Sequence, residues 1–195
     1  MLKTVCVFCA SSSMVDKSYM NAAVSLADVC CNNDIRVIYG GGAVGLMGAL
    51  ATRILEKGGK VTGIIPDFMI ELEWAHTEVS EMIVVEDMRE RKRQLIENVD
   101  AVIALPGGIG TLEELMEVST LKQLGLFNKP IFIVNTDGFY DTLIKFFEEM
   151  VAKNFMNENN HGIWCVIEDP SQLIKAYTNI LPWDNNISRS GESLK

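Results

Sequence analysis

The sequence predicts an α/β fold: a doubly wound, mainly parallel sheet of about seven strands with helices on both faces. Three observations indicate it. Short runs rich in valine and isoleucine alternate with segments whose apolar residues recur at helical spacing. The short runs lack the polar alternation of a half-exposed sheet, which is typical of strands buried on both faces. Regular alternation of strand and helix implies right-handed crossovers between parallel strands.

The individual elements follow from this pattern. Each predicted strand is a short apolar run: Thr4–Cys9, Arg36–Tyr39, Lys60–Ile65, Glu81–Glu86, Ala101–Leu105, Pro130–Asn135 and Ile163–Ile167. The predicted helices are Asp16–Asn32, Ala43–Lys57, Asp87–Asn98, Gly110–Phe127, Gly138–Lys153 and Pro170–Ile180. Because the alternation is unbroken, residues 1–182 are expected to form a single Rossmann-like nucleotide-binding domain. Residues 183–195 are polar and unpatterned, which predicts a frayed tail.

Composition excludes several classes of function. The formal net charge of -9 argues against binding to a nucleic-acid polymer, because basic surface carries most of that affinity. A local backbone site can still hold a small anion. The five cysteines, an odd number lying mostly in apolar runs, are interpreted as reduced residues of a cytoplasmic protein. No apolar run approaches the length of a membrane span, so no membrane partner is expected.

Three stretches follow predicted strands at the edge of the sheet where ligands of such folds bind: CASSS, YGGGAVGLMG and LPGGIGT. In the last of these, glycines permit a sharp turn from strand to helix. The first N–H groups of that helix lack internal partners and carry partial positive charge, so an anion is the natural occupant. We therefore predict a phosphate-binding loop made by Gly107, Gly108, Gly110 and Thr111. A tight turn capped by Thr111 is the alternative.

Glu114 is the first candidate for a catalytic role. Helical spacing places it one turn beyond Thr111 on a largely apolar stripe, whereas Glu113 and Glu117 are expected in solvent. A carboxylate beside a bound phosphate can hold ribose hydroxyls, orient water or stabilise a developing cation. Simple stabilisation of the helix dipole is the alternative.

Arg91 is the second candidate. It shares an inward-facing helical stripe with Met88, Lys92 and Leu95. A charge on such a stripe needs an anionic partner, because an unpaired buried charge is costly. Arg91 and Glu114 are therefore expected to converge on one cleft, with Met88 and Lys92 as substrate-binding candidates. A purely structural arginine–carboxylate pair is the alternative.

The glycine-rich stretch after the second strand matches G-x-G-x-x-G, which is typical of NAD sites. The match is weak, because three consecutive glycines satisfy it easily and no clear ribose-binding acid ends the third strand. We interpret the stretch as a place where a nucleotide approaches the backbone closely. Gly41, Gly42 and Ser12 are the substrate-binding candidates there. Tight packing of helix on strand is the alternative.

The sequence predicts no metal site and no cofactor. His76 and His161 have no cysteine or carboxylate partners at metal-ligand spacing. No signature for pyridoxal phosphate is present.

Taken together, PGGIGTLEE and the upstream MRERK resemble the PGGxGTxxE and M-x-x-R-K signature of the LONELY GUY family. Members of this family are cytokinin riboside 5′-monophosphate phosphoribohydrolases, often labelled lysine decarboxylases. The resemblance extends from VCVFCASSS through YGGGAVGLMG and GIIPDFM to NKPIFIVNTDGFYDTL, nearly the whole chain.

The resemblance implies a Rossmann-like homodimer or larger assembly, with a nucleoside 5′-monophosphate site near the subunit interface. It places the family's catalytic arginine and glutamate at Arg91 and Glu114, and its motif lysine at Lys92. The family's phosphate loop corresponds to residues 107–111. Relatives usually have glycine at the position of Ala10, and often at that of Met14, which bears on base preference more than on chemistry.

The expected reaction is hydrolysis of the N-glycosidic bond of an adenine-type nucleoside 5′-monophosphate, with or without the modified base of a cytokinin. Its products are free base and ribose 5-phosphate. Glu114 would stabilise an oxocarbenium-like sugar and help to activate water, and Arg91 would bind the substrate. A non-catalytic nucleotide-binding or carrier module that uses the same loop is the alternative.

Overall fold

The computed structural model describes residues 1–71, 74–181 and 183. The predicted tail, apart from Trp183, and the side chain of His161 lie outside that part of the chain. The end of the proposed domain, residue 182, lies outside it as well.

Seven strands form one sheet in the order β4-β3-β2-β1-β5-β6-β7, and every neighbouring pair is parallel. Their bounds are β1 (Thr4–Phe8), β2 (Arg36–Tyr39), β3 (Val61–Pro66), β4 (Glu81–Val85), β5 (Ala101–Ala104), β6 (Ile131–Val134) and β7 (Cys165–Ile167). The chain starts at the central β1, builds outward to β4, returns beside β1 and builds outward to β7. This reversal is the topological switch point at which α/β sheets bind ligands. The predicted fold class is confirmed.

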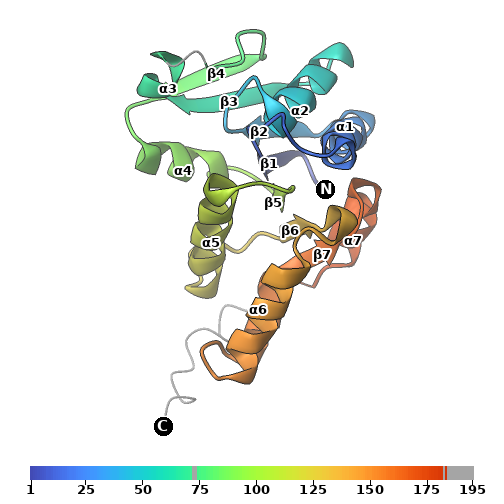
Figure 1. The fold of residues 1–195 in the computed structure, drawn as a ribbon, viewed down its shortest axis with the longest axis vertical. Coiled ribbons are helices and arrows are strands. Elements are labelled where there is room, and N and C mark those ends of the chain that lie inside the picture. The colour runs from blue at the N-terminus through green and yellow to red at the C-terminus, as the bar shows by residue number, and fades with distance from the viewer. Residues whose placement is uncertain (72–73, 182, 184–195) are drawn as a thin grey trace.

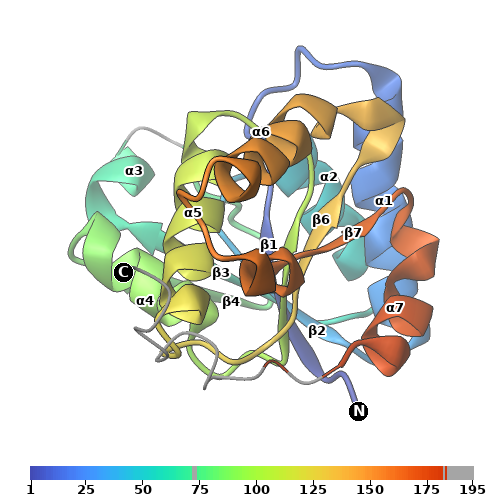
Figure 2. The same ribbon diagram turned by 90° about the horizontal axis from the view of Figure 1, so that it is seen from below.

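Helices cover both faces of the sheet (Figures 1 and 2). They are α1 (Lys17–Asn32), α2 (Gly45–Glu56), α3 (Asp67–Glu71), α4 (Met88–Ile96), α5 (Ile109–Gln123), α6 (Asp141–Ala152) and α7 (Leu173–Asn179). One core contains Val5 and Val7 together with residues of α1, α2 and α7. The other contains Cys6 and Phe8 with residues of α4, α5 and α6. Alternate side chains of β1 thus enter opposite cores, as a strand buried on both faces requires.

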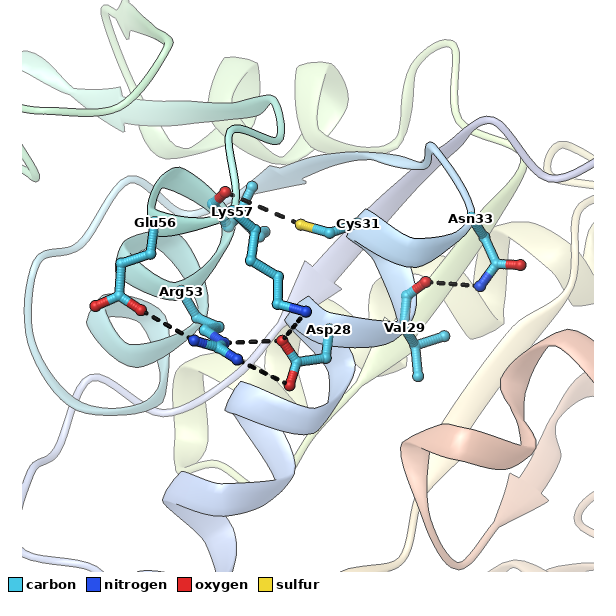
Figure 3. Close-up of polar contacts among 8 residues, drawn as sticks. Asp28, Val29, Cys31, Asn33, Arg53, Glu56 and Lys57 are labelled. Carbon is cyan, nitrogen blue, oxygen red and sulfur yellow. Dashed lines mark hydrogen bonds and ion pairs between the residues drawn. The ribbon is translucent and has the colours of Figure 1, made fainter.

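Helices α1 and α2 are joined by ion pairs as well as by apolar contacts. Arg53 of α2 pairs with Asp28 of α1 at 2.8 Å, and Lys57 reaches the same carboxylate at 3.1 Å (Figure 3). The Arg53 hydrogen bond lowers the pKa of Asp28. Because the Arg53 and Asp28 side chains are about a third exposed, at 34% and 33%, this pairing fixes the orientation of the helices more than it stabilises the fold.

The predicted bounds differ from the observed ones where the backbone turns left-handed. The helix predicted from Gly138 begins at Asp141, because Asp137 and Gly138 have φ values of 54° and 70°. The helix predicted to reach Phe127 ends at Gln123, before Gly125 with φ 73°.

Two further differences are local. The last strand is shorter than predicted, because residues 158–163 form a 3-10 helix ahead of it. Helix α3 was not predicted, since its five residues are too few to show a period. Among the described helices, none combines the length and the apolar character that a membrane crossing requires.

Candidate active site

The carboxyl ends of β1, β2 and β5 open into one cleft of about 530 Å³, a size typical of small-molecule sites. All three stretches singled out in the sequence contribute to its wall. Of the predicted site residues, those that line it are Ser12, Gly42, Met88, Arg91, Gly108, Gly110, Thr111 and Glu114.

Ala10 ties the three loops together. Its N–H donates to the carbonyl of Pro106 at 3.2 Å, and its carbonyl accepts from Met47 N–H at 3.2 Å. Gly45 packs directly against the loop after β1. Its φ is 66°, and a Cβ at this position would lie 2.5 Å from the backbone of Ser11 and Ser12, so a side chain would not fit. Ala10 itself lines the cleft, as expected from the departure at this position, whereas Met14 is exposed to solvent.

Arg91 and Glu114 meet on the wall of the cleft. Arg91 Nη1 donates to Glu114 Oε1 at 3.0 Å, and the two side chains are only 8% and 11% exposed. Helix α4 carries Arg91 and is started by Asp87, whose carboxylate accepts from the N–H groups of Arg89 and Glu90. The predicted convergence of the two residues is therefore present in the structure.

Arg91 is also bonded to two backbone carbonyls. Its Nε donates to Ile64 O at 3.1 Å and its Nη2 to Gly40 O at 3.2 Å. A Cβ on Gly40 would lie 2.2 Å from Nη2, so only glycine leaves room for the guanidinium. Gly40 is the first glycine of the G-x-G-x-x-G match, which was interpreted as a place of close approach by a nucleotide; in the structure its carbonyl accepts a hydrogen bond from Arg91.

Glu114 is poised to exchange a proton near neutrality. Burial raises the pKa of Glu114 to about 7, while the charge of Arg91 acts in the opposite direction. Glu113 adds to the rise in this pKa, and Lys92 reduces it.

The glycine-rich loop after β5 leads directly into α5. Gly108 is the N-cap without a side-chain hydrogen bond, and the N–H of Leu112 is the first to reach back into the turn, to Gly108 O at 3.0 Å. The preceding helical N–H groups have no intrahelical acceptor and are suited to an anion. Thr111 is not the cap of the turn, which removes the alternative that rested on it.

Gly107 supports the loop from behind the cleft. A Cβ there would lie 2.1 Å from Thr111 Oγ1, and Thr111 is only 4% exposed. Gly107 is not among the residues that line the cleft, so its part is to let Thr111 approach the backbone.

Lys92 faces away from the cleft. Its Nζ forms ion pairs with Glu113 and Glu117, although the approach to Glu117 lacks hydrogen-bond geometry. The hydrogen bond that Lys92 donates to Glu113 is the first cause that raises the pKa of Lys92, and the nearby Glu117 carboxylate adds to the rise. Glu113 and Glu117 were expected in solvent, and they are about half exposed. Both also pair with Lys92, because its long side chain spans the gap between α4 and α5.

The loop after β2 is held at each carbonyl. Gly40 O accepts from Arg91, Gly41 O from His76 N–H at 2.9 Å, and Gly42 O from the Tyr39 hydroxyl at 3.2 Å. Gly41 has φ 78° and does not line the cleft. Gly41 therefore allows the loop its left-handed turn, whereas Gly42 also lines the cleft.

Part of the cleft wall is apolar. Met47, Met69 and Trp74 line it, and Trp74 O accepts from Ala43 N–H at 3.0 Å. Sequence reasoning did not single out Met69 and Trp74 as site residues, because residues 67–76 follow no clear helical or strand period.

His76 makes ordinary structural contacts. Its Nε2 lies 3.3 Å from Thr52 Oγ1, and its Nδ1 accepts from Glu78 N–H at 3.3 Å. Within residues 1–71, 74–181 and 183, no three histidine, cysteine, aspartate or glutamate side chains gather as metal ligands.

Comparison with known proteins places this chain in a family. A sequence profile described as "Possible lysine decarboxylase" matches residues 47–177. One cytokinin riboside 5′-monophosphate phosphoribohydrolase of Arabidopsis thaliana is 37% identical over 95% of this chain and 86% of its own length. Another is 42% identical over 89% of this chain and 80% of its own length. The chain belongs to the LONELY GUY, or LOG, family. This LOG protein is thus a member of a family of enzymes, the phosphoribohydrolases.

Solved structures share the fold at lower identity. The molybdenum cofactor binding protein of Rippkaea orientalis superimposes with a TM-score of 0.69 at 19% identity, covering 92% of this chain and 98% of the other. The molybdenum cofactor carrier protein of Chlamydomonas reinhardtii gives 0.68 at 18% identity, with the same coverage. These likenesses show the fold alone.

Proposed function

We propose that this LOG protein hydrolyses the N-glycosidic bond of an adenine-type nucleoside 5′-monophosphate to free base and ribose 5-phosphate. One observation carries the proposal: a buried Arg91–Glu114 pair lies in the same cleft as a glycine-rich helix N-terminus. The cytokinin riboside monophosphate relatives named above support it.

The phosphate binds at the N-terminus of α5, against the N–H groups that follow Gly108 and the Thr111 hydroxyl. Because the phosphate is remote from the bond that breaks, its binding energy positions the sugar. The site works without a metal or cofactor.

The chemistry takes place at Glu114. The C–N bond breaks, its electron pair leaves with the base, and the sugar becomes an oxocarbenium-like cation. The ionised Glu114 stabilises that cation and takes a proton from the attacking water, while the departing base takes up a proton from solvent, so that the products are free base and ribose 5-phosphate. Arg91 spends three of its five N–H donors on Glu114, Ile64 O and Gly40 O, which leaves two for the substrate.

The base lies against the apolar part of the wall, at the side chains of Met47, Met69 and Trp74. This environment suits adenine and also the apolar substituent of a cytokinin base. Comparison of AMP with isopentenyladenosine monophosphate as substrates measures the preference.

The phosphate requirement tests the proposal. AMP should release adenine, whereas adenosine, which lacks the phosphate, should release none at the same concentration. Chromatography of free base and of ribose 5-phosphate follows both products. Equal release from the two substrates would contradict the assignment of the loop.

Two other functions make different predictions. A carrier would bind AMP tightly without releasing ribose 5-phosphate. A pyridoxal-dependent lysine decarboxylase would need a lysine to hold the cofactor as a Schiff base. No lysine is among the described residues that line the cleft.

We also infer a cytoplasmic homodimer with the site near its interface. Ile109 lines the cleft yet is 82% exposed, and Leu124 and Leu126 at the far end of α5 are 60% and 72% exposed. A second copy that covers this helix would shield these side chains from water and close the cleft. All five cysteines are free thiols, in keeping with a reducing compartment.

A further inference from the structure

Two buried tyrosine hydroxyls hold the two glycine-rich loops of the cleft. Tyr39 Oη donates to Gly42 O at 3.2 Å, and Tyr140 Oη donates to Leu105 O at 2.8 Å. The two side chains are 0% and 1% exposed. Neither tyrosine lines the cleft, so neither can touch a bound substrate directly.

We propose that Tyr39 and Tyr140 are positioning residues with separate tasks: Tyr140 sets the phosphate loop, and Tyr39 sets the backbone that holds the Arg91–Glu114 pair. The inference rests on the proposed function and assigns to each hydroxyl a different step of it.

Tyr140 acts on the entry to the phosphate loop. Leu105 is the first residue after β5, and its N–H already donates to Phe8 O at 2.9 Å. Its carbonyl is fixed by the Tyr140 hydroxyl. The next residue, Pro106, has no N–H to donate, and its own carbonyl accepts from Ala10 N–H at 3.2 Å. The direction of the Leu105 carbonyl, together with this bond from Ala10, therefore sets the path of the chain into Gly107 and Gly108.

Tyr140 is itself held firmly. Its backbone N–H donates to Asn135 Oδ1 at 2.8 Å, and Asn135 Nδ2 donates to Asp141 Oδ1 at 2.8 Å. The hydroxyl thus transmits the position of the start of α6 to the loop after β5.

Tyr39 acts on the arginine through the neighbouring glycines. Gly40 O receives Arg91, and two residues later Gly42 O receives Tyr39. Glycine has a wide range of backbone angles, so this loop depends on its hydrogen bonds for a single conformation. Without the hydroxyl, the loop loosens and Arg91 loses a fixed acceptor, and Glu114 moves with its partner.

Both phenols remain donors at physiological pH. Burial raises the pKa of Tyr39 and of Tyr140 far above the usual value, and the nearby Cys9 thiol adds to the rise. Tyr→Phe substitution removes the donor and keeps the ring that fills the core, so it isolates the hydroxyl.

The experiment compares Tyr39→Phe, Tyr140→Phe and the control Tyr177→Phe, which changes a tyrosine of α7 outside the cleft. The measurements are kcat and KM for AMP, and Kd for ribose 5-phosphate, which carries the phosphate without the base. All are made at a temperature at which each protein is folded by circular dichroism.

Tyr140→Phe should raise KM for AMP and Kd for ribose 5-phosphate about five-fold with kcat nearly unchanged, the loss expected of one hydrogen bond. Tyr39→Phe should lower kcat about ten-fold and leave Kd for ribose 5-phosphate nearly unchanged. Tyr177→Phe should change none of these.

An NMR measurement makes the Tyr39 arm independent of turnover. The Arg91 Nε–H, bonded to Ile64 O, should exchange with water faster in Tyr39→Phe than in Tyr140→Phe. If the wild type binds ribose 5-phosphate but releases no base, the proposed function fails while both arms of this inference are still measured. The inference is overturned if the two variants change the same parameter, if neither differs from Tyr177→Phe, or if either fails to fold at any temperature.

Discussion

Arg91 is bonded through all three of its nitrogens, so its guanidinium is in place before a ligand arrives. Such preorganisation is worth more in a water-poor cleft than the same contacts are in solvent. The pair explains why an inward-facing arginine is tolerated and supplies a carboxylate that ionises in the neutral range. The structural and the catalytic interpretation of Arg91 are thus compatible.

The first prediction concerns pH. If Glu114 acts as a carboxylate, as proposed, then because its pKa is raised to about 7, kcat should rise with pH and level off above that value. Arg91 lowers the pKa of Glu114, so Arg91→Gln should move the rising limb to higher pH as well as reduce its height. A pH–rate profile of both proteins measures this. A limb that stays in place in Arg91→Gln would mean that another group titrates.

The sequence predicted the Arg91–Glu114 pair because both residues lie on regular helices, where spacing determines direction. It could not predict that the partners of Arg91 include Gly40 O and Ile64 O, since backbone acceptors leave no mark in the residue pattern. Lys92 shows the same limit from the other side. Its Cα lies on the predicted stripe, but its flexible side chain reaches two carboxylates outside the cleft.

At the scale of elements, the turn from β5 into α5 contains one glycine that is closely packed and one that is open to the cleft. A Cβ at Gly107 would collide with Thr111 Oγ1 at 2.1 Å, whereas a Cβ at Gly108 would meet no atom within 4 Å. The two glycines are adjacent in the same PGG motif, and the sequence alone does not show that their surroundings differ.

The second prediction uses this difference. Gly107→Ala should lower the melting temperature and weaken AMP binding, because Thr111 must move; a cost of about 1–3 kcal/mol is expected for such crowding. Gly108→Ala should fold as stably as the wild type, yet weaken AMP binding, because its new methyl faces the cleft. Thermal unfolding and AMP titration separate the two. Similar melting temperatures for both variants would contradict the described turn.

Helices α5 and α6 show how far local pattern extends. Their apolar spacing predicted that they exist, but their ends depend on left-handed residues such as Asp137 and Gly125. Gly125 is a recognisable helix terminator, whereas an aspartate with φ 54° is not, because its conformation is set by the surrounding loop.

For the whole molecule, the reversal of strand order at β1 brings together loops that are distant in sequence. Alternation of strands and helices was sufficient to predict a parallel sheet and the edge at which the site lies. The apolar part of the cleft wall was not predictable in the same way. Trp74 reaches it through backbone pairing of residues 74–76 with Gly41–Ala43, a contact between segments that carry no shared pattern.

The third prediction concerns assembly. If the exposed apolar side chains at the two ends of α5 lie in a subunit interface, the protein should sediment at about twice 21.6 kDa. Leu126→Glu should shift it toward the monomer, since Leu126 is 72% exposed and a charge would oppose burial. Phe155→Glu, at a residue 81% exposed beyond α6, is the matched control. A wild-type monomer at micromolar concentration would refute the dimer and leave the reaction untouched.

The central claim is that Glu114 breaks the glycosidic bond of a nucleotide held by the phosphate loop. The most direct measurement is the rate of free-base release from AMP by the wild type and by Glu114→Gln, together with the Kd of each for AMP. The account predicts release by the wild type, and a loss of at least about 100-fold in kcat in the variant with Kd changed only a few-fold. Wild-type turnover by Glu114→Gln, or AMP binding without any base release by the wild type, would contradict it.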